Sequence, residues 1–189
     1  MKKGSLSPNE HIKSIVSSVL TDEENAENSP QSRSELDSHA NMVVLGKNCF
    51  VFDGINGNTC EVQPFDPNIG TTKNVPIIDG SIAYDCPYSH QTYILILRNA
   101  LHVTTMNNNL FPPFILREAG LTVNEIPKIH ISDPSTDDHS IIFPDSSLKI
   151  PLQLWGVFSF FNTRKPTSQE ISECDKIFLT PDSPPLGSI

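Results

Sequence analysis

Short apolar runs separated by turn-forming residues are the feature that most constrains how this chain can fold. From Glu35 onward these runs are rich in β-branched and aromatic side chains, and Gly, Pro, Asn and Asp bound them. Runs of this kind predict strands, and the residues between them predict turns. They are Met42–Leu45, Cys49–Phe52, Cys60–Val62, Val75–Ile78, Ile82–Tyr84, Tyr93–Leu97 and Ala100–Val103. Many short strands at this spacing favour an all-β barrel or sandwich over a βαβ fold.

Local signals also predict turns and one helix. Three dipeptides that tolerate positive φ predict tight turns, namely Asp53-Gly54, Asn56-Gly57 and Asp79-Gly80. The segment Phe114–Ala119 predicts a helix, because Pro112-Pro113 suits its start and Gly120 suits its end.

The rest of the chain divides into an extension and two tails. Further strands are expected over Leu121–Ile131 and Ile141–Val157, with a hairpin joining Ile141–Phe143 to Leu148–Ile150. The predicted organisation is a flexible tail at 1–34, a main domain at 35–125, a β-rich extension at 126–163 and a polar, Pro-rich tail at 164–189. In the first tail, Asn9–Leu20 has the apolar spacing of a short amphipathic helix.

Composition and charge exclude several classes of function. The 189 residues suit one domain of ordinary size, and the net charge of −9 disfavours binding to nucleic acid or to an anionic membrane surface. The four cysteines lack the close spacing of zinc sites, and no apolar stretch is long enough to span a bilayer. We therefore expect an intracellular, cytoplasmic protein with reduced cysteines and no cofactor.

The segment Ser34–Gly46 contains the pattern with the clearest chemistry. Asp37 is followed by the hydroxyl residue Ser38 and the small residue Ala40, and then by an apolar run. An aspartate presented in this way could act together with a second carboxylate, with a water molecule held between them. Two carboxylates that close share a proton and cannot both ionise, so one of them acts as an acid and the other as a base. Taken alone, an Asp-Ser pair also suits an Asx-turn that opens a strand. The pattern leaves a catalytic and a structural interpretation of Asp37 open.

Two segments together resemble the aspartic peptidase domain of Ty/copia-type retrotransposon polyproteins. Leu36–Asn41, followed by Val43–Gly46, is similar to the catalytic loop and next strand of that family, D-[ST]-G-A. Downstream, Leu97–Val103 and Asn109–Phe111 are similar to the copia-type pattern NVLYVP…NLLS. The resemblance implies a retropepsin-like closed barrel with one short helix, in which the strand Asn109–Phe111 enters beside the catalytic aspartate.

The resemblance also implies roles for individual residues. Asp37 would activate water, Ser38 would brace the loop, and His39 and Ala40 would complete the motif. A flap over Glu61–Ile78 would cover the substrate, with contacts from Asn68, Ile69, Gly70, Leu110 and Phe111. The chain departs from the family at His39, where the motif has Gly, and a Cβ is costly wherever φ is unusual. Because residues 35–125 contain one such motif, an active unit would be a homodimer with Asp37 at its two-fold axis.

Two other sites are weaker alternatives. Ser38 and His39 are adjacent and point to opposite faces of an extended chain, which disfavours a Ser/His hydrolase. His130, Asp133, Asp137, Asp138 and His139 are metal-ligand types, but the intervening Pro134-Ser135-Thr136 favours an acidic surface loop.

The function that the sequence predicts is therefore an aspartic endopeptidase that cleaves its own polyprotein as a homodimer. The alternative is a catalytically inactive domain that serves as a structural or interaction segment of the polyprotein. The predicted partners are a second copy of the chain and a polyprotein peptide.

Overall fold

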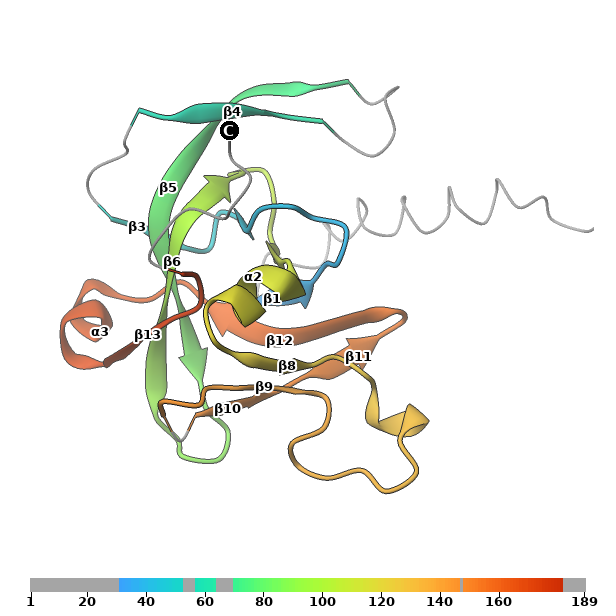
Figure 1. Ribbon diagram of the computed structural model, residues 1–189. Helices are drawn as coiled ribbons and strands as arrows, with labels where there is room; N and C mark the ends of the chain where they lie inside the picture. Colours follow the sequence, from blue (N-terminus) through green and yellow to red (C-terminus); the bar gives the residue numbers. More distant parts are fainter. Residues whose placement is uncertain (1–30, 53–56, 64–69, 147, 182–189) are drawn as a thin grey trace, which may run out of the picture. The chain divides into compact units, whose positions relative to one another are not determined.

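The structure is a computed structural model that describes residues 31–52, 57–63, 70–146 and 148–181 (Figure 1). These residues belong to the compact unit Gln31–Ile189, and the helix expected at Asn9–Leu20 lies outside the described residues. The strands are β1 (Gln31–Leu36), β2 (Val44–Leu45), β3 (Phe50–Val51), β4 (Thr59–Val62), β5 (Thr72–Asp85), β6 (Thr92–His102), β7 (Asn109–Phe111), β8 (Thr122–Asn124), β9 (Ser140–Ile142), β10 (Lys149–Pro151), β11 (Gln153–Trp155), β12 (Phe158–Arg164) and β13 (Asp175–Phe178). The helices are α2 (Pro113–Glu118), α3 (Ser168–Glu173) and the 3₁₀ turn η3 (Lys128–His130).

Most of the strands form one mixed sheet, in the order β11-β12-β1-β7-β2-β6-β5-β3. The sheet curls until β12 meets β5, where Arg164 pairs with Ala83. The prediction of a mostly β fold is confirmed. The strands form only a partial ring, whereas a closed barrel was expected. Within this ring β7 lies between β1 and β2, parallel to the first and antiparallel to the second. The strand predicted to enter beside Asp37 therefore does so.

The long strand β5 corrects one prediction. The runs Val75–Ile78 and Ile82–Tyr84 belong to the single strand β5, so the turn predicted at Asp79-Gly80 is wrong. The register of β5 against β6 shifts there instead, as in a β-bulge. Gly80 has no positive φ; it is needed for space, because a Cβ would come within 3.0 Å of both Leu45 Cδ1 and the Phe50 carbonyl oxygen.

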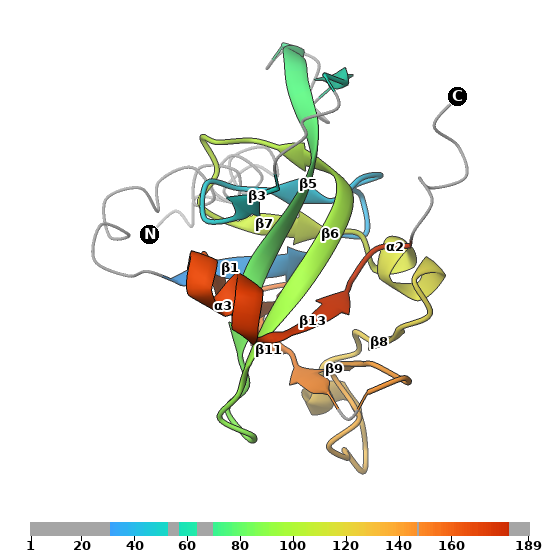
Figure 2. The same ribbon diagram turned by 90° about the vertical axis from the view of Figure 1, so that its left-hand side faces the viewer.

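A hairpin of β4 and the first part of β5 occupies the segment of the chain in which the flap was expected. Cys60 pairs with Val75 and Val62 pairs with Thr72. The hairpin projects beyond the rest of the sheet at the top of Figures 1 and 2. The residues Asn68 and Ile69, expected at its tip, lie outside the described residues, and Gly70 is exposed with a φ of +82°.

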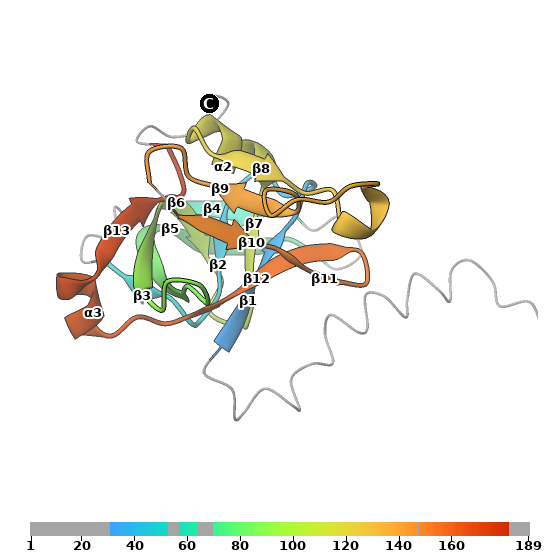
Figure 3. The same cartoon turned by 90° about the horizontal axis from the view of Figure 1, so that it is seen from below.

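The predicted helix and hairpin are both confirmed. Helix α2 begins with Pro113, and it ends before Gly120, whose φ is +85°. Strands β9 and β10 pair antiparallel, and β8 joins them in a separate three-stranded sheet (Figure 3). Of the strand expected at Leu121–Ile131, Thr122–Asn124 forms β8, and η3 follows it.

The predicted extension and C-terminal tail are parts of the same fold. Strand β12 pairs along the whole length of β1 up to Glu35, so residues 31–34 are a strand and not tail. Strand β13 pairs parallel with β6, and Leu179 after it is fully buried. The boundaries at 34 and 164 are therefore wrong, and α3 is a second helix that the sequence did not predict. Long-range pairing orders these segments although their own composition is polar.

One apolar core joins the main sheet to the three-stranded sheet. Its fully buried members include Leu45, Leu97, Phe111, Ile141 and Phe161. The rings of Phe111 and Phe161 stack with centroids 5.9 Å apart, and Tyr84 meets Phe161 edge-on at 6.0 Å. In the part of the chain that the structure describes, no helix has the length and apolar character needed to cross a membrane.

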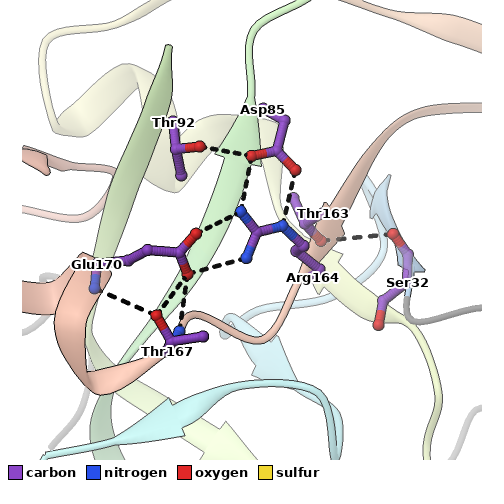
Figure 4. A network of polar contacts seen from close by, with 7 residues as sticks. All are labelled: Ser32, Asp85, Thr92, Thr163, Arg164, Thr167 and Glu170. Carbon is purple, nitrogen blue, oxygen red and sulfur yellow. Dashed lines mark hydrogen bonds and ion pairs between the residues drawn. The ribbon is translucent and has the colours of Figure 1, made fainter. Parts of the chain in front are cut away.

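Arg164 ties the C-terminal helix to the sheet through two carboxylates (Figure 4). Its guanidinium donates to Asp85 at 2.7 and 2.8 Å and to Glu170 at 2.6 and 2.9 Å. Glu170 also forms a capping box with Thr167 at the start of α3. The hydrogen bonds from Arg164 are the main cause that lowers the pKa of Glu170 to about 2. The network therefore fastens α3 to β5.

We expect Glu170→Gln to lower the free energy of unfolding by about 1 kcal/mol at neutral pH, because glutamine keeps the cap but loses the charge-assisted bonds. The pKa of Glu170 is lower in the folded chain than its ordinary value of 4.5. Its stabilisation is therefore present above that value and is lost as the pH falls toward about 2. Urea unfolding of both proteins across this pH range measures the difference. Glu173→Gln, on the same helix without a contact to Arg164, is the matched control, and an equal loss in both variants would contradict the prediction.

Candidate active site

Asp37 lies directly after β1, where the neighbouring strand β7 fixes its backbone. Its backbone N–H donates to the carbonyl oxygen of Phe111 at 3.0 Å, which continues the pairing of Leu36 with Phe111. The side chain is about one-third exposed, at 31%. Asp37 is therefore a carboxylate that solvent can reach, held at the end of a buried strand.

The loop after Asp37 is an Asx-turn. Asp37 Oδ1 accepts a hydrogen bond from the backbone N–H of His39 at 2.9 Å. The imidazole Nδ1 of His39 lies 3.7 Å from the same oxygen, and this side chain is 88% exposed. His39 is not among the residues with positive φ, so the backbone strain expected there from the loss of Gly is absent. The ring points away from the core and leaves the loop geometry intact.

The other predicted site residues divide between surface and core. Ser38 is exposed, Ala40 is half-buried, and Leu110 on β7 is half-buried. Phe111 has no exposed surface, and its ring stacks on Phe161. Its side chain therefore packs in the core and does not suit the substrate contact expected of it. The contact of Phe111 with the loop is made by its carbonyl oxygen, which accepts from Asp37 N–H.

Behind the loop lies a buried polar cluster that joins four segments of the chain. Asn109 on β7 is fully buried, and its Oδ1 accepts from the backbone N–H of Gly46 at 2.9 Å. Its Nδ2 donates to Ser34 Oγ on β1 at 3.1 Å and lies 3.4 Å from Thr163 Oγ1 on β12. The Ser34 and Thr163 hydroxyls are 2.8 Å apart. Through Asn109, the cluster therefore connects β1, which precedes Asp37, to Gly46, which follows β2.

The backbone at Gly46 lies close against the backbone of Met106 and Asn108. A Cβ on this residue would lie 2.5 Å from the carbonyl oxygen of Met106 and 2.8 Å from that of Asn108. The backbone N–H of Lys47 donates to the same Met106 oxygen at 2.9 Å. Gly46 is therefore required for close approach of two backbones and not for a positive φ.

We expect Gly46→Ala to destabilise the protein by about 1–3 kcal/mol, because the added methyl group forces two backbone segments apart. Denaturant unfolding measures the loss. Lys47→Ala, at the exposed neighbouring position, is the control and should leave the midpoint nearly unchanged. A Gly46→Ala protein as stable as wild type would show that the segments at Gly46 and Met106 are not packed as described.

The residues considered as metal ligands are separated by the fold. His139 is buried and bonds Ser159 through Nε2 at 2.9 Å, and its burial lowers the pKa of the imidazole. Asp137 pairs with Lys149, and Asp138 accepts from Ser135. Among the residues that the structure describes, no three His, Cys, Asp or Glu side chains gather as a metal site would require. Asp137 and Asp138 therefore bind side chains and backbone of the surrounding protein.

Sequence reasoning missed the support that Asn109 and Thr163 give to the loop. The sequence indicates Asn109 only as the start of the strand Asn109–Phe111, and Thr163 only as the last residue of the extension at 126–163. A polar residue opening an otherwise apolar strand, as Asn109 does before Leu110 and Phe111, was the available signal. Nothing in the local sequence around Thr163 indicates its partner, which is 129 positions away.

Comparisons of the chain with protein-family models, with curated proteins and with solved structures found no match.

Proposed function

We propose that this chain is an aspartic endopeptidase of the retropepsin-like type, in which two copies each contribute Asp37 to one catalytic pair. The substrate would be an extended segment of a polyprotein, bound beneath the β4–β5 hairpin by strand addition. One Asp37 would take a proton from water while the other donates a proton to the substrate carbonyl oxygen.

The observation that carries the proposal is the combination of accessibility and orientation at Asp37. One carboxylate oxygen is fixed by the His39 backbone N–H at 2.9 Å, while 31% of the side chain stays exposed. The strand β7 holds the backbone of this residue from the other side. A general acid or base needs a carboxylate that is oriented by fixed groups and still open to water, and both conditions hold here.

Two further features support the same function. The β4–β5 hairpin projects beyond the rest of the sheet (Figure 2), and a projecting hairpin suits a cover over an extended substrate. Ser38, His39 and Asn41 in the loop are exposed, so the surface around Asp37 is available to a second copy.

A second candidate is a peptidase-like domain without activity that acts as a structural or interaction segment. It is favoured by the imidazole of His39, which stands 3.7 Å from Asp37 Oδ1. An imidazole beside the carboxylate takes up space that a glycine at this position would leave open.

Cleavage by the purified chain tests the two candidates. The chain is incubated with an unfolded protein substrate from mildly acidic to neutral pH, the fragments are identified by mass spectrometry, and the oligomeric state is measured by sedimentation. If the chain is an active endopeptidase, it should be a dimer and should cleave the substrate. A folded dimer that cleaves nothing at any of these pH values supports the inactive domain, and a strict monomer contradicts both the dimer and the two-chain catalytic pair.

A further inference from the structure

We infer that Thr163 is a positioning residue for the Asp37 loop, acting through Ser34 and Asn109 from a strand far along the chain. The part of this inference that concerns catalysis depends on the proposed function, while the part that concerns the loop does not. Thr163 lies on β12, outside the segment in which the aspartate motif and its supporting strands occur.

The hydroxyl of Thr163 completes the hydrogen bonding of the cluster. It lies 3.5 Å from the Ser32 carbonyl oxygen, 2.8 Å from Ser34 Oγ and 3.4 Å from Asn109 Nδ2. If Thr163 donates to Ser32, it can accept from both Ser34 and Asn109, and the hydroxyl protons of Thr163 and Ser34 then both have a partner. Removing this one hydroxyl takes the acceptor from the Ser34 proton and one of two neighbouring acceptors from Asn109 Nδ2.

Both ends of the loop depend on groups that this hydroxyl holds. Ser34 stands on β1, three positions before Asp37, and it pairs in register with Asn109. Asn109 in turn accepts from Gly46 N–H, just after β2 at the far end of the loop. These side chains are almost fully excluded from water, with exposures of 0% for Ser34, 0% for Asn109 and 3% for Thr163. Solvent therefore cannot replace a lost partner, and the amide of Asn109 keeps its bonds to Gly46 and Ser34 but loses its contact with Thr163 once the hydroxyl is gone.

Packing alone does not explain a threonine at this position. Phe161, two residues earlier on the same face of β12, fills the core with an aromatic ring, whereas Thr163 faces three polar groups. A valine of the same shape would fill the space equally well but could not accept from Ser34. The hydroxyl is therefore the feature that this position supplies.

The test compares Thr163→Val with Thr163→Ser. Valine keeps the shape and removes the hydroxyl, whereas serine keeps the hydroxyl and removes a methyl group. Amide exchange is measured by NMR at Asp37 N–H and Gly46 N–H, the hydrogen bonds at the two ends of the loop, with Leu179 N–H, bonded to Ile96, as a distant reference. We expect exchange at the two loop amides to be about tenfold faster in Thr163→Val, with the reference amide unchanged, and near wild type in Thr163→Ser.

Peptide cleavage gives the second readout. We expect Thr163→Val to lower kcat roughly 10- to 100-fold with KM within about twofold of wild type, because a misplaced catalytic group affects the chemical step more than binding. Thr163→Ser should restore most of kcat even where it is less stable than wild type.

The outcomes separate this inference from the proposed function. A wild-type chain that cleaves nothing overturns the proposed function, while the exchange experiment still decides whether Thr163 holds the loop. Unchanged exchange at Asp37 and Gly46 in Thr163→Val overturns the inference, even if the enzyme is active. Equal losses in the valine and serine variants, following their stability, would likewise show that Thr163 acts by packing alone.

Discussion

Replacing Asp37 by asparagine should lower peptide cleavage by roughly 10²- to 10⁴-fold, the range expected when a general acid or base is removed. Asparagine has the same shape and its Oδ1 can still accept from His39 N–H, so the Asx-turn should persist. It cannot share a proton with a second carboxylate. The change therefore removes the chemistry and leaves the fold, and initial rates of cleavage measured beside the circular dichroism spectrum establish both points.

Asp145→Asn is the matched control for this experiment, because Asp145 is exposed in the turn between β9 and β10. It makes the same chemical change at a surface position, and it should leave the rate of cleavage unchanged. If Asp37→Asn and wild type cleave equally fast, the activity belongs to another site or to a contaminant.

Mixing wild-type and Asp37→Asn chains would show that each active unit uses two copies. When subunits exchange freely and the variant is in large excess, nearly every wild-type chain has an inactive partner. The activity per wild-type chain should then fall in proportion to the wild-type fraction, because a pair with one carboxylate cannot divide the acid and base roles. An activity per wild-type chain that stays constant would instead place the whole site in one chain.

Replacing Phe161 by alanine should destabilise the protein by about 3–5 kcal/mol, the cost of removing a large buried aromatic side chain. Phe161 is 1% exposed, and its ring contacts Phe111 on β7 and Tyr84 on β5. The loss would leave a cavity directly beneath the strand that supports Asp37. Urea unfolding with linear extrapolation measures the change.

The neighbouring residue Phe160 provides the control, since it lies on the opposite, half-exposed face of β12. Phe160→Ala should cost no more than about 1 kcal/mol. A similar small loss for Phe161→Ala would mean that β12 does not pack against the main core. Residues 126–163 would then be a separate extension after all.

Much of the local structure could be predicted because its signals are local. Pro113 and Gly120 specify the limits of α2 through the conformations they favour, and the pair of apolar runs around residues 144–147 specifies the β9–β10 hairpin. The Asx-turn at Asp37, one of the two interpretations that the Asp-Ser pair left open, also depends on neighbouring residues. Each of these features depends on residues within about one turn or strand of each other.

Other features depend on partners that are remote in the sequence. The dipeptide Asp79-Gly80 has the composition of a turn, yet β6 pairs on both sides of it and extends β5 through a bulge. The residues after 164 have the composition of a tail, yet β6 accepts β13 as a parallel neighbour and Arg164 anchors α3. In both places long-range hydrogen bonds and ion pairs outweigh the local preference.

The sequence by itself determined the all-β character, helix α2 and the one carboxylate with a candidate catalytic role. Only the tertiary structure decided that His39 stands in an unstrained turn, that Phe111 lies in the core, and that Thr163 reaches the strand before Asp37. The physical reason is the range of the interactions. Side-chain periodicity and turn chemistry act between neighbours along the chain, whereas a buried hydroxyl finds its acceptors only when strands 129 positions apart pair in register.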